Sequence, residues 1–543
     1  DILAKFASTG KFSPFDIRHF IFSPYFWQEL QYAIAIYFSS LAMAYFLKGR
    51  GLSALASYGA GLFLGFCGYW FTLFSAGHFG WFHWMAFGPF SFGLIDRIVR
   101  KGKIRSYLLL GAVMAWSCFY QSDLWFLFAL FIGAYFVWAH FREKKRPEIR
   151  KLSLCILVFV SVGLPGFLSA FSDLAFRDKQ IEESSSKAAD SKQSDFERWI
   201  FVTNWSLPPD EISEFLIPRV NGDTSCSMVL SLGRQQHTGV RQYTGALGRP
   251  YNATAGNYRQ HSLYVGFVTC IFAVFGLISI FFKDESRNRG EKIFFAAAAI
   301  LCCLLSFGRY FEALYKIVYA LPVGNYLRAP VKWHHLTEFS LVVLSGFGVE
   351  FFYKRLLKAV NVKIARAIVC VIVAAGAINL ASVAKLYCAA VDLTVVRSQN
   401  PAAVDMIEKG GGKLADVMSG GSGLVAWSFS SYGLNVVRNP VEEDVRFIWA
   451  GIEQLNNRAF SEWVKSKKAK PIGLYTLTKR GVFRAGRAGA NMALLEIPDV
   501  DFHPRAERFP EFSFITLAGV FSVLASLFVV LFATGASFFD RFR

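Results

Sequence analysis

The chain has 543 residues, of which 54% are apolar and 57 are phenylalanine, and its formal net charge is +19. This composition is far more apolar than that of an average soluble domain, so it excludes an ordinary globular protein. The positive charge does not indicate nucleic-acid binding, because much of it lies in short loops between apolar stretches. We therefore expect a protein that lies in a membrane, contacts membrane lipid and binds no nucleic acid.

Eleven apolar stretches follow one another along the chain, and most approach the ~20 residues that a helix needs to cross the hydrocarbon core. We place them at 26–47, 52–74, 81–99, 105–120, 123–141, 152–172, 261–282, 292–307, 333–353, 364–386 and 513–538. This pattern predicts an α-helical polytopic membrane protein with about 11 transmembrane helices.

Lysine and arginine fill every second short loop between these stretches, whereas the alternate short loops 75–80 and 121–123 contain neither. Because cytoplasmic loops carry the excess of basic residues, this alternation orients the protein in the membrane. The basic loops contain Lys48 and Arg50, followed by the basic residues of 97–105, 142–151, 283–292 and 354–366. The two long segments are then predicted to lie outside the cytoplasm.

The prediction divides the chain into five parts. These are an N-terminal transmembrane region with an external start (1–172), an extracytoplasmic loop (173–260), a second transmembrane region (261–386), a small extracytoplasmic α/β domain (387–511) and a C-terminal transmembrane helix (512–543). The α/β interpretation follows from a helical pattern near 400–409 and from short apolar or β-branched runs after it. Because residue 1 is Asp and should lie outside, we expect that a first helix or a cleaved signal peptide preceded it.

Most of the nine cysteines lie inside apolar stretches and form no pattern of metal ligands. Small, soft side chains of this kind pack well among apolar neighbours. Cys226 and Cys388 are the two that would face the outside. One disulfide between them is compatible with this location, although their spacing does not decide whether it forms.

Ionisable residues near the external ends of the stretches are the candidates for a functional site, because such groups are costly beside a membrane. Asp1 and Asp16 lie in the external start, and either carboxylate could act as a general base in a partly dry site. His78 and His83 lie among tryptophans, where interfacial anchoring is a stronger interpretation than metal ligation. Asp123 opens the fifth stretch, where a helix cap is favoured over a general base.

The densest group of such residues lies within 305–338 and consists of Arg309, Arg328, Lys332, His334 and His335. Prolines and a glycine interrupt this part of the chain, so we expect 308–332 to be a re-entrant or interfacial segment that lines a cavity. Arg328 offers a planar fork for phosphate oxygens, and Lys332 offers a point charge nearby. The alternative is that both side chains only extend to the lipid headgroups, and residue type alone does not separate the two.

Several short motifs, taken in chain order, resemble the YfhO-like integral membrane proteins of bacteria. They are AMAYFLKGRG at 42–51, the pairs Gly77-His78 and Gly88-Pro89, SLPPDEISEFLIPRVNG at 206–222, LPVGNYLRAP at 321–330 leading into LSGFGVE at 344–350, and HPRA at 503–506. Each motif is short, but together they extend over nearly the whole chain.

The resemblance implies the GT-C superfamily of glycosyltransferases. Its members move a sugar from a polyprenyl-phosphate donor to a glycan, glycolipid or protein acceptor, here at the outer face of the bacterial cytoplasmic membrane. An acidic residue of the first external loop usually serves as base there, a role that Asp1 or Asp16 would take. If part of that loop preceded this chain, the principal carboxylate is missing from it.

The resemblance also implies that basic residues near the later re-entrant segment hold the lipid phosphate. Arg328 would do this with Lys332 and Arg309. The remaining candidates around the substrate are His78, His83, His334, His335 and Asp123. No cofactor is required, although a divalent metal such as Mg or Mn could assist as an electrophile.

Two other functions fit the sequence. A lipid-linked sugar flippase or transporter would also contain broken helices, and it would predict inverted internal repeats, which we do not find between the two halves. A non-catalytic membrane assembly scaffold would bind partners through its outer domain and would not need the outer charged groups. We favour an inverting glycosyltransferase, because two large external segments suit an enzyme that covers a lipid-linked sugar.

Overall fold

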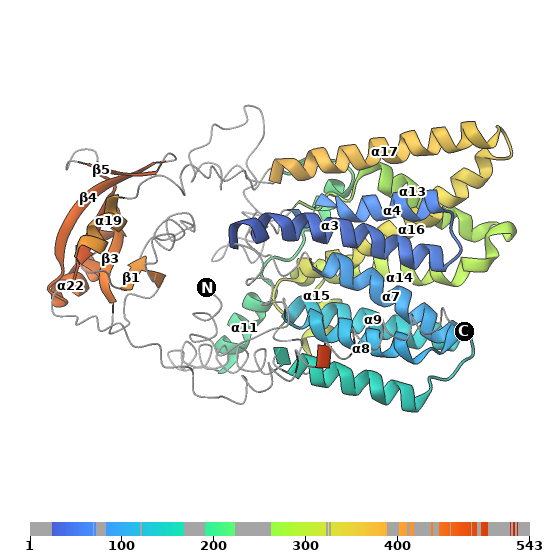
Figure 1. The fold of residues 1–543 in the computed structure, drawn as a ribbon, viewed down its shortest axis with the longest axis horizontal. Coiled ribbons are helices and arrows are strands. Elements are labelled where there is room, and N and C mark those ends of the chain that lie inside the picture. The colour runs from blue at the N-terminus through green and yellow to red at the C-terminus, as the bar shows by residue number, and fades with distance from the viewer. Residues whose placement is uncertain are drawn as a thin grey trace. The chain divides into compact units, whose positions relative to one another are not determined.

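The computed structural model describes residues 24–68, 70–71, 83–119, 122–164, 166–167, 191–222, 262–321, 324, 327–387, 401–409, 413–416, 436–437, 445–456, 458–478, 481–485 and 490–497, together with 522, 525, 526 and 529. The chain divides into two compact units, both drawn in Figure 1. The first unit comprises Asp1–Cys226, His237–Ala389 and Phe509–Arg543, and the second comprises Ser227–Gln236 and Ala390–Arg508. Each unit has hydrophobic cores of its own.

The first unit is built from helices. Its α-helices are α3 (Pro24–Gly49), α4 (Ala54–Gly65), α7 (Trp84–Lys101), α8 (Ile104–Ser117), α9 (Ser122–Arg142), α11 (Ser191–Val202), α13 (Phe267–Ile278), α14 (Arg289–Ser306), α15 (Glu312–Tyr319), α16 (His334–Leu356) and α17 (Val362–Tyr387). Its 3₁₀ helices are η2 (Pro209–Phe215), η3 (Ser279–Phe281), η4 (Lys283–Asn288), η5 (Gly308–Phe311) and η7 (Pro330–Trp333). Residues 149–164 are helical as well.

Four helices of the described residues are long and apolar enough to cross a membrane. They are Leu30–Gly49, Leu124–Arg142, Pro330–Leu356 and Val362–Lys385. A fifth span is added if Phe267–Phe281 and Lys283–Ser306 are counted as one broken span, in which the chain bends by 108° between the two helices. The structure is therefore that of a helical membrane protein, but its described residues do not reach the predicted number of about 11 spans.

The shortfall has physical reasons. Helix α4 has 12 residues and α8 has 14, fewer than the ~20 that span the hydrocarbon core. Helix α7 ends in charged residues, among them Asp96 and Arg100, which lower the hydropathy of its C-terminal half. The last predicted stretch, 513–538, falls outside the described residues except for 522, 525, 526 and 529.

Helix α16 lies at the centre of the first unit. In its most apolar window 78% of the residues are buried, against 39–44% in the other three candidate spans. Helices α4, α13 and α14 pack around it. Helix α13 comes closest, since a Cβ on Gly348 would lie 1.7 Å from the carbonyl oxygen of Phe272, and one on Gly276 would lie 2.2 Å from that of Leu344. The two helices thus cross through glycines, as closely packed membrane helices often do.

The second unit contains a mixed six-stranded sheet in the order β2-β1-β3-β6-β4-β5. The strands are β1 (Lys413–Asp416), β2 (Val436–Val437), β3 (Val445–Gly451), β4 (Lys470–Thr478), β5 (Gly481–Arg484) and β6 (Met492–Glu496). Strand β1 runs parallel to β2 and β3, whereas β6 is antiparallel to both β3 and β4, and β4 is antiparallel to β5. The predicted small domain of strands and helices is therefore present, while its location outside the cytoplasm stays a prediction.

Each face of this sheet is covered by a helix, because successive strand residues point to opposite sides. Trp449 of β3 packs with Met406 of α19 (Pro401–Glu408) in one core, whereas Ile448 packs with Trp463 of α22 (Arg458–Ser466) in the other. A short helix, α21 (Ile452–Leu455), connects β3 to α22. On the α19 side, burial raises the pKa of the Tyr475 phenol, and its hydrogen bond to the Asp405 carboxylate raises it further.

Candidate functional site

Two segments of the first unit, 200–207 and 327–333, are joined by backbone hydrogen bonds, and together they form what we call the basic arch. The amide of Ala329 donates to the carbonyl oxygen of Val202 at 3.1 Å, and the amide of Val331 donates to the carbonyl oxygen of Trp205 at 3.2 Å. Both segments bend sharply, since the φ angles of Trp205 and Ala329 are 64° and 65°. Residues other than glycine seldom adopt a positive φ, and backbone strain of this kind is common at functional sites.

Arg328 lies in the basic arch, where its guanidinium contacts two aromatic rings. Its Cζ is 4.5 Å from the ring centroid of Phe201 and 4.9 Å from that of Trp205. Cation–π contacts of this kind favour the charged guanidinium and hold it in place. Lys332 follows in η7 and is 7% exposed, which puts a second cation in the same short segment.

Arg309, a predicted phosphate ligand, makes structural contacts. Its Nε donates to the carbonyl oxygen of Thr203 and its terminal nitrogen to that of Ile200, both at 3.0 Å. Only 4% of Arg309 is exposed. The side chain therefore holds one segment of the basic arch in place, and its hydrogen bonds to carbonyl groups are invisible in a sequence pattern.

Gly308 permits the close approach of the two arch segments. Its φ is +48°, and a Cβ there would lie 2.2 Å from Ser206 Oγ and 2.5 Å from Pro330 Cγ. We expect Gly308→Ala to destabilise the protein by about 2 kcal/mol, because it adds both a clash and backbone strain. The midpoint of thermal unfolding in detergent measures this loss. Gly49→Ala is the control, since its Cβ would meet nothing within 4 Å, and equal midpoints for the two variants would contradict the expectation.

Helix α16 begins with buried ionisable residues. His334 and His335 are 0% exposed, and their rings lie 4.5 Å and 4.2 Å from those of Phe215 and Trp70. Glu338, one turn further along, is also 0% exposed. Buried ionisable groups in a candidate span are expensive and mark functional positions. The sequence prediction omitted Glu338, although its spacing of three and four residues from the histidines is a signal that could have found it.

The other predicted site residues lie elsewhere or outside the described residues. His83 is the half-buried N-cap residue of α7, and Asp123 lies in the first turn of α9. Asp1, Asp16 and His78 lie outside the described residues. The described part of the chain contains no group of three or more His, Cys, Asp or Glu residues that could hold a metal ion. A divalent metal therefore stays a prediction.

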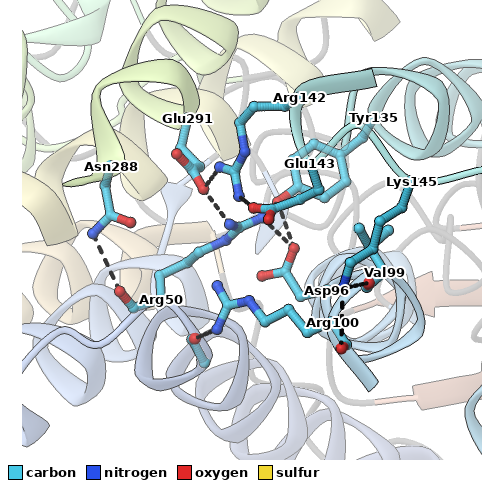
Figure 2. A network of polar contacts seen from close by, with 11 residues as sticks. Arg50, Asp96, Val99, Arg100, Tyr135, Arg142, Glu143, Lys145, Asn288 and Glu291 are labelled. Atoms are coloured by element: carbon cyan, nitrogen blue, oxygen red, sulfur yellow. Dashed lines mark hydrogen bonds and ion pairs between the residues drawn. The ribbon is translucent and has the colours of Figure 1, made fainter. Parts of the chain in front are cut away.

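A second polar cluster, which we call the charge network, joins helices α7, α9 and α14 to Arg50, the residue that follows α3 (Figure 2). The Arg50 guanidinium forms ion pairs with Asp96 of α7 and Glu291 of α14, and it donates to the hydroxyl of Tyr135 in α9. The Tyr135 hydroxyl donates in turn to Asp96 Oδ1 at 2.9 Å. The charged residues are only 1–3% exposed, and Arg142 adds a second cation on Glu291.

The backbone around the charge network is tied by further bonds. Asn288 Nδ2 donates to the carbonyl oxygen of Arg50 at 3.2 Å, and Lys145 Nζ donates to that of Val99 at 3.0 Å. Arg100 donates to the carbonyl oxygen of Gly49. Four of the predicted basic loops thus meet at one end of the bundle. Which side of the membrane this end faces stays a prediction.

The fold and these two clusters define a helical membrane protein with a small α/β domain, a cationic arch before one candidate span, and a buried charge network. No family model matches the chain, and no curated protein and no solved structure matches it. The resemblance to YfhO-like proteins therefore stays a prediction.

Proposed function

We propose that this chain is a glycosyltransferase of the GT-C type. It moves a sugar from a polyprenyl-phosphate donor to an acceptor at the outer face of the bacterial cytoplasmic membrane. The same proposal places 173–260 and 387–511 outside the cytoplasm. It also includes the YfhO-like resemblance.

The observation that carries the proposal is the placement of Arg328 in the basic arch. The guanidinium contacts the rings of Phe201 and Trp205, with Lys332 in the turn that follows. This cationic segment leads directly into the candidate span Pro330–Leu356. A phosphate whose lipid tail lies in the membrane would meet two cations where the span begins, and their charge attracts it.

The chemistry follows from the leaving group. An acceptor hydroxyl oxygen attacks the anomeric carbon, the bond from that carbon to the phosphate oxygen breaks, and polyprenyl phosphate leaves as an anion. Fixed cations stabilise the charge that develops on this phosphate in the transition state, a role for Arg328 and Lys332. A carboxylate on the side opposite the phosphate, Asp16 or Asp1, takes the hydroxyl proton. Because the acceptor attacks from that side in a single displacement, the anomeric configuration is inverted.

The other candidates have supporting roles in this proposal. Arg309 is a positioning residue, because its hydrogen bonds to the carbonyl groups of Ile200 and Thr203 hold the segment that carries Phe201 and Trp205. His334 and His335 are fully buried against aromatic rings, so they support the start of α16 and do not contact the substrate. The arch can therefore be tested through Arg328 alone.

The test is transfer of labelled sugar from synthetic polyprenyl-phosphate donors to membrane extracts by the purified full-length protein. We expect Arg328→Ala to lower the rate about 100-fold, because one fixed charge that stabilises the leaving group is lost. Arg355→Ala is a matched control, since Arg355 also stacks on two rings, with Cζ 4.4 Å from Phe282 and 4.8 Å from Phe351. That variant should retain native activity.

Two results would contradict the proposal. Equal loss of transfer in the two arginine variants would show that the loss is not specific to the charge in the basic arch. Folded native protein that consumes no donor, but moves labelled lipid between the leaflets of vesicles, would assign the chain to the flippases.

A further inference from the structure

Basic residues are segregated within the second unit. Residues 458–487 contain nine Lys or Arg and one acidic residue, whereas 401–457 contains four basic and seven acidic residues. The centre of the basic part is a set of exposed lysines between the last turn of α22 and the first residue of β4, which we call the lysine cluster: Lys465, Lys467, Lys468 and Lys470. Within the part of the chain that the structure describes, none of these four side chains forms an ion pair.

The backbone is strained at the end of α22, at a position where glycine would be unstrained. The amide of Ala469 donates to the carbonyl oxygen of Val464 at 3.3 Å, and that of Lys468 donates to the carbonyl oxygen of Lys465 at 3.0 Å. This pair of bonds defines a Schellman motif, whose left-handed residue is usually glycine. Here the residue is Lys468, with a φ of 52°. A lysine at a position where glycine would fold more easily indicates that its side chain serves something besides the fold.

Helix α9 ends in the same motif, again with lysine in the left-handed position. The amides of Lys144 and Lys145 donate to the carbonyl oxygens of Phe141 and His140, both at 3.1 Å, and the φ of Lys144 is 51°. Because Leu124–Arg142 is a candidate span, we expect this turn to lie near the membrane surface. The same arrangement is then expected near lipid headgroups at one other place in the chain.

We propose that the lysine cluster docks the second unit on anionic lipid headgroups. The main segment of the unit runs from Ala390 to Arg508, and the chain on both sides of it belongs to the first unit, which contains the candidate spans. Because the main segment of the second unit is tethered at both ends to the first unit, a bilayer that contains the candidate spans is at high effective concentration for the lysine cluster. Exposed lysines are attracted to such a surface when its lipids are negative. The helix dipole explains a cation in the last turn of α22, such as Lys465, but not the three lysines beyond it.

The test uses the full-length protein in nanodiscs of phosphatidylcholine with or without phosphatidylglycerol. Acetylation of individual lysines by a water-soluble reagent is followed by mass spectrometry. At low ionic strength we expect the lysine cluster to react about fivefold more slowly in the anionic bilayer, and high salt should remove this protection. Lys409, in the same unit but paired with Glu496, is the internal control and should react equally in both bilayers.

Lys468→Gly separates docking from folding, because it removes one charge and also relieves the strained turn. We expect its thermal midpoint to equal or exceed the native value, while the protection of the other three lysines weakens. Equal reaction rates of the native lysine cluster in neutral and anionic bilayers would overturn the proposal. Protection that appears only when a soluble anionic polysaccharide is added to neutral nanodiscs would also overturn it, since the partner would then be a polymer.

Discussion

Replacing Arg50 with methionine is expected to destabilise the first unit by about 3–5 kcal/mol, because it leaves two buried carboxylates without their shared cation. Asp96 and Glu291 are 3% and 1% exposed, so water cannot replace the guanidinium. Of the two carboxylates, Tyr135 donates to Asp96, and Arg142 pairs with Glu291. Neither residue can join α7 to α14 as Arg50 does.

The loss is measured as the shift in unfolding of the purified protein in detergent on titration with a denaturing surfactant. A triple variant, Arg50→Met with Asp96→Asn and Glu291→Gln, should recover most of the stability, because no unpaired charge then remains buried. Lys358→Ala is the surface control, since its pair with Asp284 is 3.5 Å long and largely exposed, and it should cost less than about 1 kcal/mol. An Arg50→Met protein as stable as the native one would show that the charge network does not hold these helices together.

Gly348→Ala is expected to force α13 and α16 apart and to cost about 3 kcal/mol. The added methyl group would lie 1.7 Å from the carbonyl oxygen of Phe272, and a backbone carbonyl cannot rotate away as a side chain would. Gly133→Ala, in α9, is the matched control, because its Cβ meets nothing within 4 Å. That change should be neutral or stabilise by about 0.5–1 kcal/mol through helix propensity. Equal thermal midpoints for the two variants would contradict the close crossing.

The helical membrane character and the strand-containing domain could be predicted from the sequence, but the number of spans could not. Hydropathy records how apolar a stretch is, and it does not distinguish a helix that faces lipid from one buried among other helices. Helix α4 is an example. It is apolar but only 12 residues long, and its Gly61 lies so close to α3 that a Cβ would be 2.4 Å from the carbonyl oxygen of Ser40.

The candidate site could be predicted only in part, for a similar reason. Prolines and basic residues in one short stretch pointed to Arg328 and Lys332, but the rings that hold Arg328 come from a segment more than a hundred residues earlier. The acceptors of Arg309 are backbone carbonyl groups, which no residue type announces. A lone carboxylate inside an apolar stretch, such as Asp96, was a usable signal for the charge network, because it requires a partner.

The affinity of the purified protein for polyprenyl phosphate, measured in nanodiscs, tests whether the basic arch holds the lipid phosphate. Replacement of Arg328 with alanine should weaken binding about tenfold to 100-fold, since a charge-assisted pair of hydrogen bonds is lost. Arg328→Lys should recover part of the affinity, because it restores the charge without the planar fork. Arg355→Ala should bind as the native protein does. Equal affinities of native protein and Arg328→Ala would contradict the assignment of the phosphate to the basic arch.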